Sequence, residues 1–91
     1  MSALNLTPDR YFWTNDGKGL KNLTELLNEL RSMSQETFYH HVQPGKNDFA
    51  NWINDVLQDT VTARAIRGLT TKTEHFKVIQ ALHKWRPASV R

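Results

Sequence analysis

The sequence predicts an all-α protein: a compact bundle of four to five short helices with an N-terminal aromatic arm packed across it. Apolar residues recur in several segments with the spacing of one helical face. Capping residues precede these segments, and Pro or Gly follows several of them. The chain of 91 residues fits one domain, 1–91, and a hydrophobic content of 38% with 10% aromatic residues is enough for one core.

An aromatic cluster, Tyr11-Phe12-Trp13, comes before the first helix, and a turn signal, Asp16-Gly17, follows it. Such a turn could close a short hairpin, but no second strand of suitable pattern follows. We therefore expect an extended arm whose aromatic rings lie across the helices. Residues 1–10 are polar and mixed, and we expect them to be poorly ordered.

The first helix is predicted from about Leu20 or Leu23 to Met33. Asn22 can act as its N-cap, and Glu25 occupies the capping-box position three residues later. Four leucines share one arc of this helix and are expected to face the core: Leu20, Leu23, Leu27 and Leu30.

A second, shorter helix is predicted to begin after a new cap at Ser34 and to extend to Val42. The segment 43–46 ends it, because its proline cannot continue the helix and its glycine allows the chain to reverse. Phe38, His41 and Val42 share one face. We expect His41 to be semi-buried there, with one ring nitrogen hydrogen-bonded.

The central helix is predicted to begin at an Asn47 cap, with Asp48 complementing its positive end. At about 100° per residue, four large side chains fall within an arc of roughly 100°. These are Phe49, Trp52, Ile53 and Val56. This stripe is the expected centre of the core.

A fourth helix is predicted over 60–67, with Asp59 as its cap and Gly68 just beyond its end. Three of its residues are expected to face inward: Val61, Ala65 and Ile66. The last helix opens with the capping-box pair Thr71 and Glu74 and extends to about Trp85. Pro87 stops it, and we expect residues 87–91 to be poorly ordered.

Two motifs carry a resemblance to a known family. Phe38-x-x-His41-Val42 is followed by Asn47-Asp48-Phe49-Ala50-x-Trp52-Ile53. This pattern, over roughly residues 11–68, resembles a family of small prokaryotic helical domains of unknown function. The resemblance implies a small helical module that is sometimes joined to other domains. It implies no activity and assigns no functional residue.

The sequence predicts no catalytic, metal or cofactor site, so we expect a protein that is not an enzyme. The chain contains no cysteine. His40 and His41 are adjacent and would point about 100° apart on a helix, so they cannot chelate one ion together. The serines and threonines lack the context of a nucleophile.

Basic residues are concentrated in the C-terminal third. Residues 61–91 contain seven Lys or Arg against one Glu, whereas residues 1–60 contain five against eight Asp or Glu. One interpretation is that the acidic and basic parts face each other within the fold or between copies. The alternative is a nucleic-acid interface. Its candidate residues are Arg64, Arg67, Lys72, Lys77, Lys84 and Arg86.

Aromatic residues near the two ends of the chain support a different function. Tyr11, Trp13 and Trp85 are hard to enclose fully in so small a domain, and an exposed aromatic patch suits a protein partner or self-association. The alternative is that the arm folds over the last helix and buries them. We therefore expect a small interaction module that binds a protein partner or its own copies, with nucleic-acid binding as the second hypothesis.

The location of the protein is predicted from what the sequence lacks. No basic region followed by an apolar run is seen at residues 1–6, and no segment approaches the ~20 apolar residues of a membrane span. We therefore expect no membrane partner and a cytoplasmic setting.

Overall fold

The computed structural model describes residues 6–84, and it is mostly helical with two small antiparallel sheets. The five α-helices are α1 (Leu23–Ser32), α2 (Gln35–His41), α3 (Asp48–Asp55), α4 (Thr60–Ile66) and α5 (Lys72–Lys84). The four strands are β1 (Phe12–Trp13), β2 (Gly19–Leu20), β3 (Val42–Gln43) and β4 (Lys46–Asn47). A 3₁₀ turn, Pro8–Arg10, precedes β1. We expected poor order for residues 1–10 and 87–91; residues 1–5 and 87–91 lie outside the described part of the chain, whereas residues 8–10 form this 3₁₀ turn.

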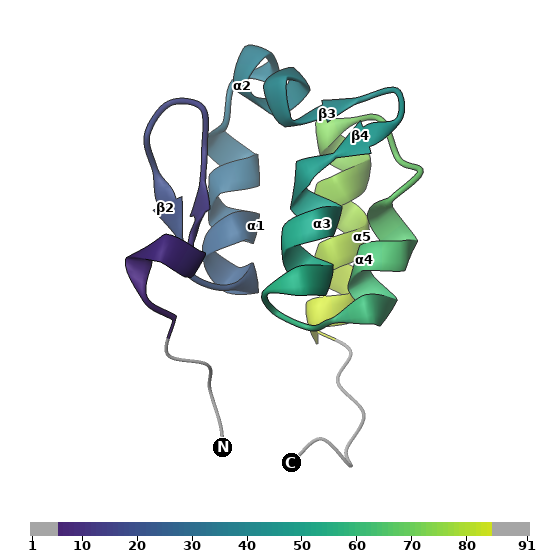
Figure 1. The fold of residues 1–91 in the computed structure, drawn as a ribbon. Coiled ribbons are helices and arrows are strands. Elements are labelled where there is room, and N and C mark those ends of the chain that lie inside the picture. Colours follow the sequence, from purple (N-terminus) through teal and green to yellow (C-terminus); the bar gives the residue numbers. More distant parts are fainter. Residues whose placement is uncertain (1–5, 85–91) are drawn as a thin grey trace.

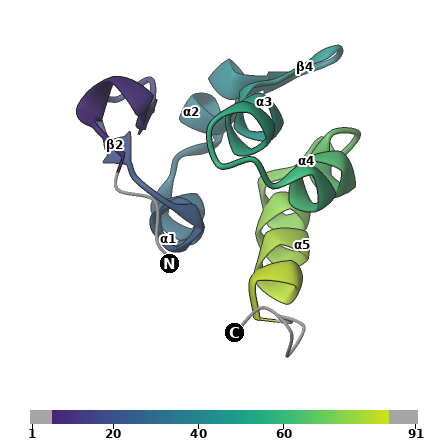
Figure 2. The ribbon, with the colours of Figure 1, turned by 60° about the horizontal axis from the view of Figure 1, so that its bottom comes forward.

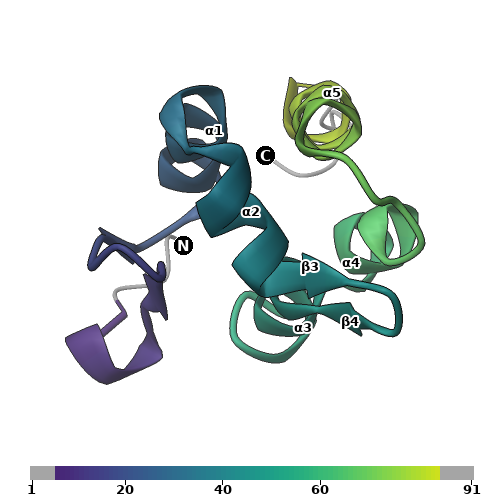
Figure 3. The ribbon, with the colours of Figure 1, turned by 90° about the horizontal axis from the view of Figure 1, so that it is seen from above.

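The helices surround a shared core. α3 packs against α4, and α5 packs against both α1 and α4. Seen from above, α1, α5, α4 and α3 lie around the core, and α2 crosses one end of it (Figure 3). The first hairpin, β1–β2, lies beside α1 on the side of the molecule opposite α4 (Figures 1 and 2). This arrangement leaves α1 between the hairpin and α5.

The N-terminal aromatic segment forms a hairpin rather than the extended arm that we expected. Phe12 pairs with Leu20, and Trp13 pairs with Gly19. The loop closes through the amide of Thr14, which donates to the carbonyl of Lys18 at 2.9 Å, and Gly17 adopts a φ of +93° that favours glycine. The second strand is only two residues long. It therefore shows no alternating pattern by which the sequence could reveal it.

A second hairpin separates α2 from α3. Val42 pairs with Asn47, and Gln43 pairs with Lys46, so the predicted reversal at Pro44-Gly45 joins two short strands. Gly45 has a φ of +78°, which a side chain would strain. The expectation of an all-α fold is therefore wrong in this respect, although the prediction of a mostly helical, compact molecule is confirmed.

The predicted central stripe lies in the core. Phe49 and Ile53 are fully buried, Val56 is half-buried, and Trp52 is only 7% exposed. The indole Nε1 of Trp52 donates to the carbonyl of Arg10 at 2.9 Å, so the 3₁₀ turn is held against α3. The ring of Phe49 lies between those of Phe12 and Phe38, with centroids 4.7 and 6.0 Å away. Such offset aromatic contacts add to the free energy gained by burial.

The inward face of α4 differs from the prediction. Val61 is 68% exposed and Ala65 is exposed, whereas Ile66 is buried as expected. Thr62 and Ala63 occupy the other inward positions. Burial of Thr62 costs little because its amide and hydroxyl both donate to the carboxylate of Asp59, the N-cap of this helix. The prediction from hydrophobicity alone therefore chose the wrong residues for the core-facing side of α4.

Asn47 joins three helices from the interior of the protein. Its Oδ1 accepts a hydrogen bond from the amide of Ala50 and caps α3. Its Nδ2 donates to the carbonyl of Ile66 in α4 at 3.1 Å and to Nε2 of His75 in α5 at 2.9 Å. Because Nε2 of His75 is an acceptor, the ring proton lies on Nδ1, which donates to the carbonyl of Thr71 at 2.8 Å.

Replacement of Asn47 should be much more costly than loss of an ordinary cap. Asn47→Ala removes the cap of α3 and leaves Nε2 of His75 without its buried partner, whereas the Ile66 carbonyl keeps the amide of Leu69. We therefore expect the free energy of unfolding to fall by about 2–4 kcal/mol. Asn22 provides a matched control, because it caps α1 through the same contact but is exposed. Asn22→Ala should cost about 1 kcal/mol in the same urea titration. Equal losses would contradict the role of the buried amide.

Stability should fall in mild acid because of His75. Burial lowers the pKa of this ring, and the Thr71 carbonyl and the charge of Glu74 oppose that shift only in part. Below the usual pKa of about 6.5, the His75 ring is protonated in the unfolded chain but stays neutral in the folded protein. The free energy of unfolding therefore decreases as pH falls. Urea titrations from about pH 7.5 to about pH 5.5 should show this loss. This loss of stability should be smaller in His75→Gln. It should be as large as in the unaltered protein in His40→Gln, where the replaced ring is exposed.

Candidate functional site

Two neighbouring side chains at the first hairpin form an aromatic surface, which we define as the half-buried Tyr11 and the exposed Trp13. Trp13 is 53% exposed, on the side of β1 opposite the buried Phe12. Its Nε1 donates to the carbonyl of Pro8 at 2.9 Å, and its ring lies 6.0 Å from that of Tyr11. A Cβ at Gly19 would stand 2.9 Å from the Trp13 ring, so the indole is seated directly on glycine. The indole is thus both exposed and fixed in place.

A pocket with a basic lining lies between α1 and α5. Its volume is about 450 Å³. We call it the basic pocket; it is lined by Leu30, Arg31, Lys72, Thr73, Phe76, Lys77 and Gln80. Two predicted nucleic-acid-binding residues, Lys72 and Lys77, therefore meet at one place. Arg31 was missed by the sequence analysis, because only the packing of α1 on α5 brings it there.

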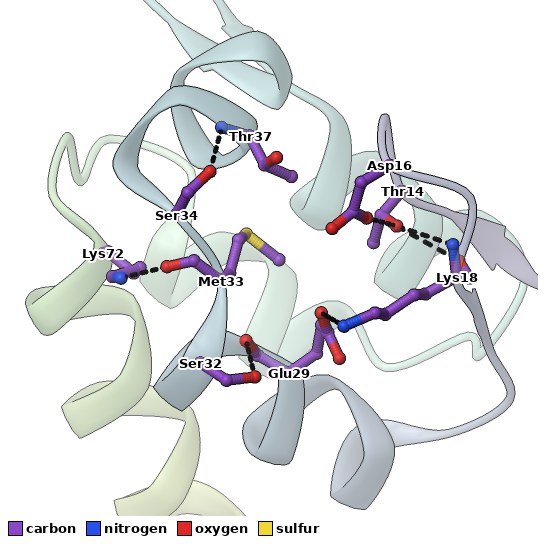
Figure 4. A network of polar contacts seen from close by, with 9 residues as sticks. All are labelled: Thr14, Asp16, Lys18, Glu29, Ser32, Met33, Ser34, Thr37 and Lys72. Atoms are coloured by element: carbon purple, nitrogen blue, oxygen red, sulfur yellow. Dashed lines mark hydrogen bonds and ion pairs between the residues drawn. The ribbon is translucent and has the colours of Figure 1, made fainter.

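Lys72 also connects the two helices that form the pocket. Its Nζ donates to the carbonyl of Met33, the C-cap of α1 (Figure 4). A cation is favourable at this end of a helix, because the last carbonyls carry partial negative charge. The start of α5 is thereby tied to the end of α1, and Lys72 has a structural role besides its place in the lining.

The acidic residues of α1 and α5 are engaged away from the pocket. Glu29 forms an ion pair at 3.1 Å with Lys18 of the first hairpin loop (Figure 4). Glu25 accepts from the amide of Lys21, and Glu74 accepts from the hydroxyl of Thr71 at the start of α5. None of the pocket-lining residues is acidic. Positive charge is therefore concentrated at this point of the surface.

The other predicted basic residues are not gathered at the pocket. Arg64 is exposed on α4, and Arg67 is exposed at its C-cap, where it donates to Oδ1 of Asn51 in α3 at 2.9 Å. Lys84 ends α5, and its side chain lies outside the described part of the structure. Arg86 and the predicted aromatic contact Trp85 also lie outside the described residues.

His41 and Asp48 are hydrogen-bonded in the manner of a catalytic His–Asp pair. Nδ1 of His41 lies 3.0 Å from Oδ2 of Asp48, and Nε2 accepts from the amide of Asn15 at 2.9 Å. An amide can only donate, so Nδ1 holds the ring proton and donates it to the carboxylate. Both ring nitrogens are occupied, and Nε2 faces the backbone instead of a substrate. This arrangement ties the first hairpin loop to the start of α3.

The described residues contain neither a metal-binding cluster nor a membrane-spanning helix. Within 6–84, no three His, Asp or Glu side chains converge as metal ligands would. In the same part of the chain, every helix is too short or too polar to cross a bilayer.

Comparisons of the chain with protein-family models, curated proteins and solved structures find no match. The resemblance to small prokaryotic helical domains therefore stays a prediction. The function must be argued from the aromatic surface and the basic pocket.

Proposed function

We propose that this protein is a non-enzymatic interaction module that binds a protein partner, a different protein or a second copy of itself, through the aromatic surface. The observation that carries the proposal is the fixed, half-exposed indole of Trp13. Tryptophan and tyrosine dominate the binding free energy of many interfaces. A side chain that is already held in position loses little conformational entropy on binding.

The geometry of His41 supports the non-enzymatic part of this proposal. Its Nε2 is the atom that would act as a base, and the amide of Asn15 already occupies it. The cytoplasmic setting stays a prediction from the sequence.

Nucleic-acid binding by the C-terminal third is the second candidate function. Lys72 and Lys77 at the basic pocket favour it, since clustered cations attract phosphates. It ranks second because the predicted cations Arg64 and Arg67 lie on a different helix and do not extend the pocket lining.

Photo-crosslinking in the cells that make the protein tests the aromatic surface. A photoreactive Tyr11→p-benzoylphenylalanine side chain would lie beside Trp13. We expect it to give a discrete adduct whose mass identifies either a different protein or a second copy. Adding Trp13→Ala should lower the adduct yield about tenfold, because the main apolar contact is lost. Gly19→Ala keeps the indole but displaces it, and should lower the yield less.

Tyr39 supplies the matched control, because it is 49% exposed and lies on α2 instead of the first hairpin. Tyr39→Ala should leave the adduct unchanged, and the photoreactive group placed at position 39 should give none. The proposal fails if position 11 yields no adduct, or if Trp13→Ala and Tyr39→Ala have the same effect. Circular dichroism of each variant verifies that the helices are retained.

A further inference from the structure

The basic pocket combines an apolar part with enough room for a ligand group. Leu30 and Phe76 contribute apolar surface from α1 and α5, and Thr73 and Gln80 add polar groups that can form hydrogen bonds. The volume of about 450 Å³ lies within the range of pockets that enclose small ligands. The pocket is open to solvent and has room for an apolar side chain of a partner.

Three cations from two helices surround this apolar part. Arg31 and Lys77 are exposed, and the structure shows no ion pair for either of them within residues 6–84. The Lys72 ammonium is fixed by the Met33 carbonyl and keeps two further N–H groups for a ligand. A carboxylate can bind the Arg31 guanidinium through two parallel hydrogen bonds. The pocket thus places one fixed and two exposed positive charges next to an open apolar surface.

We propose that the basic pocket binds an acidic segment of a partner protein, which inserts an apolar side chain between α1 and α5 and places its carboxylates on Arg31, Lys72 and Lys77. Charge complementarity identifies the occupant: the acidic residues of both helices are engaged elsewhere, as described above. An acidic amphipathic segment presents apolar and carboxylate groups together on one face.

A nucleic acid fits this surface less well. A nucleic-acid duplex carries phosphates along its length, and proteins that bind it follow them with an extended series of cations. Here the three cations gather at one apolar pocket, and Arg67, at the end of α4, is engaged with Asn51 of α3. A compact group of carboxylates around an apolar side chain matches the arrangement more closely.

Fluorescence anisotropy of a labelled synthetic peptide tests this site. The probe is a short peptide in which Glu and Asp flank a Leu-Phe pair, and it is titrated with the full chain. We expect binding that weakens about tenfold in Arg31→Glu and in Lys77→Glu, since each reverses a charge at the pocket. Arg64→Glu makes the same change in net charge on α4 and should have little effect. Amide shifts of the labelled protein should map to 30–31 and 72–80.

Several outcomes overturn the proposal. Equal losses in Arg64→Glu and Lys77→Glu would mean that the peptide responds only to net charge. Unchanged affinity after Ser replaces the Leu-Phe pair would mean that the apolar cavity is not used, and absence of binding would reject the site. Tighter binding of an oligonucleotide of equal charge, weakened by Arg64→Glu, would establish a nucleic acid as the occupant instead. Trp13→Ala should leave peptide binding intact, so failure here and failure of the aromatic surface are distinguishable.

Discussion

The amide of Asn47 is the interaction on which the arrangement of the C-terminal helices depends. One side chain caps α3, donates to the last carbonyl of α4 and donates to Nε2 of His75 in α5. A buried amide with all these groups paired stabilises a single arrangement, whereas one missing partner would leave a polar atom unsatisfied. This contact and the contact of Lys72 with the Met33 carbonyl together position α5, and with it the basic pocket.

Two buried histidines, both neutral with the ring proton on Nδ1, link separate elements of the fold. His75 accepts at Nε2 from Asn47 and donates from Nδ1 to the start of α5. His41 accepts at Nε2 from the first hairpin loop and donates from Nδ1 to Asp48 of α3. One imidazole thus fixes the helix that forms the pocket, and the other fixes the hairpin that bears the aromatic surface. Both candidate surfaces are therefore displayed by rigid parts of the fold.

Local chemistry made the helices predictable. The caps at Asn22, Ser34, Asn47 and Asp59 are confirmed by their side-chain contacts, because each satisfies an amide only three residues away. Longer-range features were not predictable in this way. Strands of two residues carry no periodic signal, and the burial of Thr62 depends on a hydrogen bond that hydrophobicity does not reveal.

The candidate site was predictable only in part, for the same reason. The basic character of α5 could be inferred from nearby residues, whereas the sequence left open whether Trp13 is exposed or covered by the last helix. The participation of Arg31 depends on the packing of α1 against α5, which no local pattern encodes.

The protonation state of His75 tests the central role of Asn47 most directly. Nitrogen-15 spectra of the histidine rings at about neutral pH distinguish the two neutral tautomers from the charged ring. The hydrogen bonds described here require a neutral ring with its proton on Nδ1 and an unprotonated Nε2 that accepts from Asn47. A proton on Nε2, or a charged ring, would contradict the account.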